Sequence, residues 1–428
     1  MYPTRRHVLT GGTAAALVAT LASCRSSGDS DGSPTVDYAW WSSPENDAAI
    51  LAAIEKFEAD HPEVTLEGEA TPWDGYWDKL ATMSAGGNPP DLIQMSERYL
   101  LEYGQREALA DLRSVDDIDL SNFDEETLRL GESSDGVLYG IPGGLSTFVL
   151  AANVDLFAQA GVDLPDDTTW TWSDFYEISA ALADSGIVGA GYGIGIESLH
   201  PWLRQHGETM YNADGTAAGF SVEVLTSYLE HLLTLQENGG PTADQVSEDA
   251  AVPAEAGLFG TGEQGMDWAY SSTLGDLAPA ADAEMRLLCI PSQTGKAAEA
   301  GMYLKGSAFH SLSAHSDPEP QAAAGQFIDF MINSADIVQE FGMFFGVPPN
   351  PDVVDAIAPD LTPMDQHVLE FVDELRENLT TDTPGPSPSG AGNVQGIFER
   401  DVLDMLYGRG TASETAEKIL EAVNNELG

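Results

Sequence analysis

Basic residues are scarce in this chain of 428 residues. It has 17 Lys and Arg against 70 Asp and Glu, which gives a formal net charge of -53 at pH 7. A chain this acidic is repelled by nucleic acid and by anionic lipid headgroups, so we expect neither as a direct partner. The acidic residues are spread along the sequence, which is typical of a solvated surface and does not identify a ligand.

Cysteines and long apolar runs are also scarce. The chain has only two cysteines, and with the first one lipidated, as argued below, no disulfide framework is possible. Cys289 lies in an apolar, strand-like run at 287–290, where we expect a buried, unreactive thiol. No segment beyond the N-terminus has the length and apolar character of a membrane span. The 43% hydrophobic content nevertheless argues against disorder.

The N-terminus is typical of an export signal. Arg5 and Arg6 precede an apolar or small-residue run at 11–23, which is too short to span a membrane. The paired arginines resemble a twin-arginine signal, and Leu-Ala-Ser-Cys at 21–24 resembles the bacterial lipoprotein box, whose cysteine is acylated (palmitate) and becomes the mature N-terminus. An ordinary signal peptide with an incidental cysteine is the alternative. The lipoprotein interpretation predicts a signal at 1–23, Cys24 as the lipid anchor and a flexible tether at 24–34.

Strands and helices alternate after the tether. The pattern predicts strands at 36–41, 64–69 and 91–95, with helices at 48–59 and 73–83 between them. This order favours an α/β fold in which helices cover both faces of a parallel sheet. Further along, we expect strands at 191–197, 265–272 and 285–291, and helices at 169–186 (capped by Ser173), 220–238, 322–333, 365–379, 399–406 and 412–427.

Several segments, in this order and spacing, resemble extracellular solute-binding proteins of the carbohydrate-uptake type (maltose-binding-protein-like, bacterial solute-binding protein family 1), which serve ABC transporters. The segments are AAILAAIEKFEADHPEVTLE (48–67), YWDKLATMSAGGNPPDLIQMSE (76–97), YGIPGGLSTFVLAANVDLFAQAGVDLP (139–165), TWTWSDFYEISAAL (169–182), FGTGEQGMDWAYSS (259–272) and QAAAGQFIDFMINSADIVQEFGMFFGVPPN (321–350). The segment 148–153 reads FVLAAN where the family usually has the aromatic-rich YYN, which puts a ligand role for those positions in doubt.

The resemblance implies two α/β lobes, a hinge and a ligand cleft between the lobes. Carried onto this sequence, lobe one would be 35–142 plus 275–340, and lobe two 143–274 plus 341–428. It further implies a monomer without enzymatic activity or cofactor, held by its lipid on the extracellular face of a bacterial cell membrane. Its partners would be a small-molecule sugar and the membrane permease subunits of an ABC importer.

Candidate ligand residues follow from the rule that ligands bind outside the carboxyl ends of strands in open α/β sheets. Sugar hydroxyls need polar donors and acceptors, and the C–H faces of sugar rings stack on flat aromatic side chains. Each tryptophan could instead belong to the core, and for Trp73, Tyr76 and Trp77 we expect packing. The predicted ligand residues are Trp41, Ser43, Glu45, Asn46, Ser96, Glu97, Ser146, Glu197, Trp202, Trp268, Tyr270, Gly301 and Tyr303.

Other functions have weaker support in the sequence. The run Gly-Thr-Gly-Glu-Gln-Gly at 260–265 fits a dinucleotide motif, but it precedes a predicted strand instead of opening a helix. His200 and His206 have no third ligand nearby, so we expect no metal site. An exported carbohydrate-active enzyme stays an alternative, although no catalytic motif is present. A phosphorylated polyol would need basic residues, of which the candidate loops offer only Arg98. A polyamine would fit their carboxylates and aromatics, and this alternative stays open.

Overall fold

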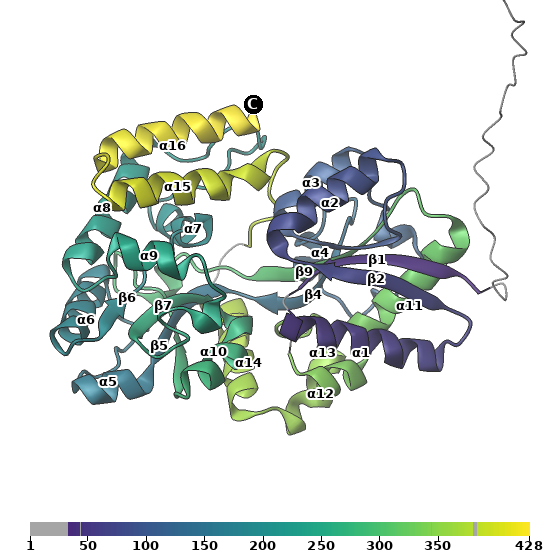
Figure 1. Ribbon diagram of the computed structural model, residues 1–428, viewed down its shortest axis with the longest axis horizontal. Helices are drawn as coiled ribbons and strands as arrows, with labels where there is room; N and C mark the ends of the chain where they lie inside the picture. Colours follow the sequence, from purple (N-terminus) through teal and green to yellow (C-terminus); the bar gives the residue numbers. More distant parts are fainter. Residues whose placement is uncertain (1–32, 43, 344, 380–382) are drawn as a thin grey trace, which may run out of the picture. The chain divides into compact units, whose positions relative to one another are not determined.

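The computed structural model describes residues 33–428, apart from residues 43, 344 and 380–382. The predicted signal, Cys24 and most of the tether therefore lie outside the described residues. Pro34–Gly428 form one compact unit, which contains two separate β-sheets with helices packed around each (Figure 1). The predicted α/β class with two lobes is confirmed, and each lobe is built on one sheet.

The first lobe has a five-stranded sheet in the order β2-β1-β3-β9-β4. Its strands are β1 (Thr35–Trp41), β2 (Thr65–Thr71), β3 (Leu92–Met95), β4 (Ile141–Ser146) and β9 (Lys305–Leu312). β1 runs parallel to β2 and β3, and helices α1 (Pro44–Asp60) and α2 (Trp73–Ala85) make the crossovers, as the alternating pattern predicted. β9 runs antiparallel to β3 and β4, so the sheet is mixed and the fully parallel prediction is wrong.

The second lobe has a four-stranded sheet in the order β6-β7-β5-β8. Its strands are β5 (Phe148–Asn153), β6 (Val188–Ala190), β7 (Gln264–Tyr270) and β8 (Met285–Leu288). β5 pairs antiparallel with both β7 and β8, while β6 is parallel to β7. β8 thus belongs to the second sheet, whereas the expected boundary had placed 275–340 in lobe one. The reason is that β8 completes its hydrogen bonds on the free edge of β5, and the chain returns to the first sheet only at β9.

Two local expectations are corrected by the backbone. Helix α6 (Trp172–Asp184) is capped by Thr171 in a reciprocal capping box with Asp174, and not by Ser173. Residues 191–195 form no strand, and helix α7 begins at Ile196 and runs to Gln205. Gly193 adopts φ +56°, and a Cβ there would lie 2.4 Å from the Trp268 ring, so this stretch is a close-packed turn that requires glycine.

The remaining helices cover the two sheets. Helix α16 packs against α8 and α15 at the C-terminal end of the chain (Figure 1). No helix within the described part of the chain has the length and hydropathy to cross a membrane. The helices not yet given are α3 (Glu97–Gln105), α4 (Glu125–Arg129), α5 (Val154–Ala160), α8 (Val222–Glu237), α9 (Ala243–Asp249), α10 (Leu274–Ala281), α11 (Pro318–Asn333), α12 (Ala335–Phe341), α13 (Pro351–Ile357), α14 (Pro363–Glu374), α15 (Val394–Leu406) and α16 (Ala412–Leu427).

Candidate functional site: a cavity between the two lobes

A cavity of about 960 Å³ is lined by residues from both lobes. The first lobe contributes the residues that follow β1 and β3, together with the ends of β4 and β9 that meet the second lobe. The second lobe contributes β7, the turn before α7, and one face of α15. Its position at the carboxyl ends of β1 and β3 agrees with the general location of ligands in open α/β sheets.

Aromatic rings line the cavity on both lobes. Trp41, at the end of β1, is half-buried and meets Trp73 edge to face with 5.2 Å between the ring centroids. Trp73 is 39% exposed, which is a larger exposed fraction than that of Trp41. On the second lobe, Phe148 stacks on Trp268 at 5.6 Å and meets Tyr270 at 4.9 Å. Each lobe therefore offers flat apolar surface on which a sugar ring can stack.

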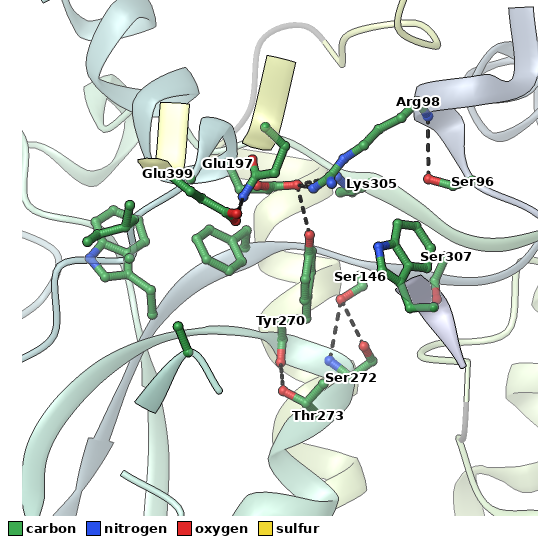
Figure 2. Close-up of a pocket in the computed structure, with 18 of the residues that line it drawn as sticks. Ser96, Arg98, Ser146, Glu197, Tyr270, Ser272, Thr273, Lys305, Ser307 and Glu399 are labelled. Atoms are coloured by element: carbon green, nitrogen blue, oxygen red, sulfur yellow. Dashed lines mark hydrogen bonds and ion pairs between the residues drawn. The ribbon is translucent and has the colours of Figure 1, made fainter. Parts of the chain in front are cut away.

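A buried ion network joins the two lobes at the cavity. Glu97 and Arg98 begin helix α3, after the N-cap Ser96, and Lys305 begins β9. From the second lobe, Glu197 lies in the first turn of α7 and forms an ion pair with Arg98; Lys305 Nζ lies 2.5 Å from Glu97 Oε1 and 3.6 Å from Glu197 Oε1. Figure 2 shows Arg98, Lys305 and Tyr270 converging on Glu197.

The network fixes the charge of Glu197. Its side chain is only 5% exposed, and the Tyr270 hydroxyl donates to Glu197 Oε1 at 3.1 Å. Burial alone would raise the pKa of this carboxyl, but the charges of Lys305 and Arg98 outweigh burial and lower it to about 2. For Lys305, burial favours the neutral amine, whereas Glu97, Tyr270 and Glu197 raise its pKa well above the usual value. Both charges are therefore retained at neutral pH.

Hydroxyl groups form another wall of the cavity. Ser146 Oγ, at the end of β4, lies 3.1 Å from Ser271 Oγ and donates to Ser272 Oγ at 3.3 Å (Figure 2). Because these contacts join β4 to the residues after β7, the hydroxyls sit where the two sheets meet. Gln94 Oε1 accepts the Trp41 backbone N–H at 3.2 Å and so fixes the end of β1. The wall offers both donors and acceptors to a polyhydroxylated ligand.

Four further carboxylates line the cavity without joining the network: Asp249, Asp267, Asp276 and Glu399. Burial raises the pKa of Asp267 to about 7, although the Trp268 backbone N–H donates to it at 2.8 Å and favours the charged form. Burial also raises the pKa of Asp276 and of Glu399. Among the described residues that line the cavity, acidic side chains therefore outnumber the two basic ones, Arg98 and Lys305.

The structure brings seven of the predicted ligand residues together at this cavity: Trp41, Ser96, Glu97, Ser146, Glu197, Trp268 and Tyr270. Ser43 lies outside the described residues. Glu45 and Asn46 lie in α1, and their side chains are outside the described part of the structure. Whether any of these residues binds ligand stays a prediction.

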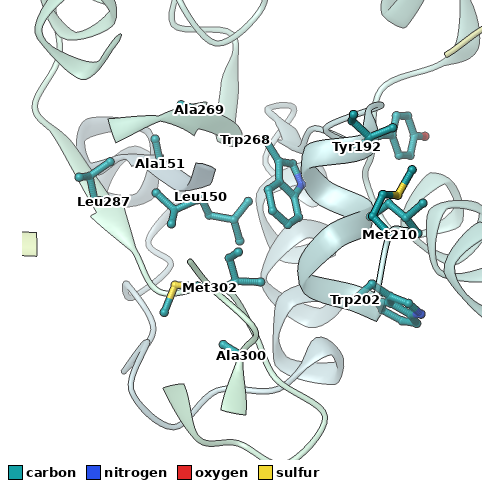
Figure 3. Packing of buried hydrophobic residues seen from close by; sticks show 14 of the residues in the cluster. Leu150, Ala151, Tyr192, Trp202, Met210, Trp268, Ala269, Leu287, Ala300 and Met302 are labelled. Atoms are coloured by element: carbon teal, nitrogen blue, oxygen red, sulfur yellow. The ribbon is translucent and has the colours of Figure 1, made fainter. Parts of the chain in front are cut away.

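Three predicted residues lie elsewhere. Trp202 is buried in the hydrophobic core of the second lobe (Figure 3). It stacks on His231 at 4.8 Å, and its Nε1 donates to Ser227 Oγ at 3.0 Å. A Cβ on Gly301 would lie 2.6 Å from the Pro201 carbonyl oxygen, so this glycine allows close packing against α7. Tyr303 is buried against His200 at 5.3 Å. None of the three is among the described residues that line the cavity.

Several lining residues were missed from the sequence. They include Trp73, for which packing was expected, and Gln94, Asp267, Lys305 and Glu399. The expected packing is found for Tyr76, which is buried, and for Trp77, which stacks on Tyr99 at 3.9 Å. Gln94 follows the apolar residues of a predicted strand and was a detectable candidate. Lys305 has no local signal, because only the pairing of β9 with β4 brings it to the cavity.

Metal and thiol chemistry find no support in the described residues. No group of three or more His, Cys, Asp or Glu side chains there is arranged to hold a metal ion. Cys289 is buried, as expected, and burial raises the pKa of its thiol. The glycine-rich run at 260–265 leads into β7 and opens no helix, so it lacks the setting of a dinucleotide site.

The comparisons with known proteins agree with this geometry. Residues 52–368 match the family model described as bacterial extracellular solute-binding protein, and the chain belongs to that family. The "uncharacterized lipoprotein in oleD 5'region" of Streptomyces antibioticus is 25% identical over 343 residues, which cover 76% of this chain and 72% of that protein.

Two solved structures share the fold. A periplasmic oligogalacturonide binding protein from Yersinia enterocolitica, solved with saturated digalacturonic acid, superposes with a TM-score of 0.80 at 21% identity, covering 92% of this chain and 98% of that one. The ABC substrate-binding protein Lmo0181 from Listeria monocytogenes, solved with cycloalternan, superposes with a TM-score of 0.76 at 20% identity, covering 92% and 98%. At these identities the likeness shows the two-lobe fold alone.

Proposed function

We propose that this solute-binding protein captures a sugar or oligosaccharide and delivers it to the membrane subunits of an ABC importer. The observation that carries the proposal is the cavity, which has aromatic rings on both lobes, a hydroxyl wall between them and charged groups that can bind hydroxyls. Flat rings and dense hydrogen-bonding groups are the two features that sugar recognition needs. The solved neighbours that bind oligogalacturonide and cycloalternan support the same solute class.

Closure of the two lobes would bury the ligand. We place the hinge where the chain crosses between the sheets: at Thr147 between β4 and β5, at residues 289–304 between β8 and β9, and near Val347, which pairs with Leu145. The first lobe is then residues 35–146 plus 305–346, and the second is 147–304 plus 347–428. Rotation about these segments would bring Trp41 and Trp268 toward the same ligand.

The protein is proposed to work at the outer face of the cell membrane, anchored by an acyl chain on Cys24 and exported through its twin-arginine signal. The acylation box in the sequence and the Streptomyces lipoprotein relative support this proposal. A single acyl chain gives only weak membrane attachment, so the lipid on Cys24 must carry at least two acyl chains to hold the protein at the membrane. The protein is expected to act as a monomer without catalysis.

A polyamine is the second candidate ligand. Asp249, Asp276 and Glu399, which lie outside the ion network, give the cavity a surplus of negative charge, which favours a cation. A phosphorylated polyol is disfavoured, because Arg98 and Lys305 are already paired with Glu197 and Glu97.

A thermal-shift screen tests the proposal. The purified mature protein is melted with neutral sugars from one to six rings, with uronates and with spermidine, and each stabilising compound is confirmed by titration calorimetry. The proposal expects a sugar to raise Tm and to bind with one-to-one stoichiometry. Binding of spermidine alone would establish the rival, and cleavage of a glycosidic bond during incubation would establish an enzyme.

A further inference from the structure

We infer that Glu197 is a specificity-determining residue that keeps acidic sugars out of the cavity, so that the ligand is a neutral sugar. The inference rests on the proposed function and adds to it the charge of the solute. The supporting observation is the position of Glu197, which comes from the second lobe and lies next to both basic side chains that the first lobe contributes to the cavity.

Arg98 and Lys305 are the two basic side chains among the described residues that line the cavity. A cation with an unoccupied hydrogen-bonding face is the strongest partner that a protein offers to a sugar carboxylate. Glu197 pairs with Arg98 and lies 3.6 Å from Lys305, and Glu97 holds Lys305 at 2.5 Å. The network contains two positive and two negative groups, so it presents no net positive charge to a ligand.

An acidic ligand could reach these cations only by displacing a protein carboxylate. Glu197 is 5% exposed, and it lies in the first turn of α7, a position that favours a negative charge. It stays ionised, because Lys305 and Arg98 outweigh burial and lower its pKa to about 2. Displacement would leave a buried carboxylate without a partner, which is strongly unfavourable.

The other carboxylates that line the cavity also oppose the binding of an acidic sugar. Asp249, Asp276 and Glu399 line the cavity and repel a ligand carboxylate, whereas none of them opposes a hydroxyl. A guanidinium has five N–H donors, and a carboxylate can accept about four hydrogen bonds, so groups that are paired with each other can still bind hydroxyls. The paired network therefore suits a neutral polyhydroxylated ligand and discriminates against its acidic counterpart.

The test compares neutral and acidic forms of the same sugar. Three matched pairs are titrated by calorimetry: the methyl ester of trigalacturonate with trigalacturonate, cellotriose with cellotriouronate, and maltotriose with its uronate. The proteins compared are wild type, Glu197→Gln, and the control Glu132→Gln, which removes a carboxylate that pairs with Arg113 and is not among the described residues that line the cavity. A fourth variant, Arg98→Gln/Glu197→Gln, removes one charge of each sign.

We expect wild type to bind at least one neutral member and to bind its acidic partner at least about 100-fold more weakly. Glu197→Gln should strengthen binding of the acidic member about tenfold or more, whereas the control and the double variant should leave the ratio within about threefold of wild type. Equal or tighter binding of an acidic member by wild type, or an unchanged ratio in a folded Glu197→Gln protein, would overturn the inference while leaving the proposed function intact.

Two other results of this experiment also have a clear meaning. Binding of no sugar by folded wild type would overturn the proposed function, and this inference with it. If Glu197→Gln does not fold, the wild-type ratio measured again in 1 M NaCl decides. Discrimination by a buried group persists at high salt, because salt screens a buried charge only weakly. If the preference for the neutral sugar disappears in 1 M NaCl, it comes from the acidic surface, and the role of Glu197 is overturned.

Discussion

Replacing Trp41 with alanine tests the aromatic wall of the first lobe. Its ring lines the cavity, and it also packs against Trp73, Tyr76 and Trp77 at centroid distances of 5.2, 5.4 and 5.8 Å. The residue is therefore neither a free platform nor a pure core residue. Trp41→Ala should lose affinity for a sugar and also some stability without ligand.

The two losses can be sized separately. Loss of a stacked ring contact costs about 1–3 kcal/mol, which is roughly 5- to 150-fold in Kd. A full Trp→Ala change in a core costs about 3–5 kcal/mol of unfolding free energy. Because Trp41 is only half-buried, we expect less, about 1–2 kcal/mol, consistent with aromatic pairs worth about 0.5–1.5 kcal/mol each. Calorimetric titration with a sugar that stabilises wild type measures the first quantity, and denaturant unfolding without ligand measures the second.

Trp77→Ala is the matched control. Trp77 belongs to the same aromatic group and stacks on Tyr99 at 3.9 Å, but it is not among the described residues that line the cavity. It should lose at least as much stability as Trp41→Ala and change affinity less than about threefold. A folded Trp41→Ala protein with unchanged affinity, or equal affinity losses in the two variants, would refute the stacking role.

Three other predictions follow from separate parts of the chain. Cys24→Ala should release the protein into the medium, and a variant that stays in the membrane fraction on cell fractionation would disprove the anchor. Exhaustive chelation should leave Tm unchanged, because no metal cluster was found among the described residues, and a large drop would reveal a site elsewhere. The pKa of Asp267 is raised to about 7, so the folded state holds its proton where the unfolded state does not, and this group lowers stability as pH rises from about 4 to 7. Asp267→Asn should therefore raise Tm relative to wild type more at pH 8 than at pH 4, and equal shifts at both pH values would contradict the assignment.

The order of helices and strands could be predicted because each element carries its own periodicity. β1, β2, β3 and the helices between them appear in the structure within a few residues of the expected ranges. Trp41, which ends β1, and Ser96 and Glu97, which follow β3, line the cavity as their positions at strand ends led us to expect. The direction of a strand and the sheet to which it belongs could not be predicted in the same way. They depend on the pairing of β9 and β8 with strands that are distant in sequence.

Trp202 shows how one local error moves a site residue. The glycines at 191, 193 and 195 suggested a strand continuing to Glu197, but α7 begins at Ile196. Five residues along a helix correspond to a rotation of about 140°, so Glu197 and Trp202 point to nearly opposite sides of α7. One therefore faces the cavity, while the other packs among Trp172, His206 and His231.

Basic residues are rare in this chain, which gives the position of Lys305 in the cavity its importance. The chain has 17 basic residues against 70 acidic ones, yet two of the basic residues, both from the first lobe, lie in this cavity next to Glu197 of the second lobe. The acidic surface repels anions only within the reach of its field, about 10 Å at 0.1 M salt and about 3 Å at 1 M. The Arg98–Glu197 pair is buried and is screened far less, so it continues to act at the site itself. In a saline exterior, the buried pair could still distinguish a neutral sugar from an acidic one, which gives this network a role that the surface charge cannot fill.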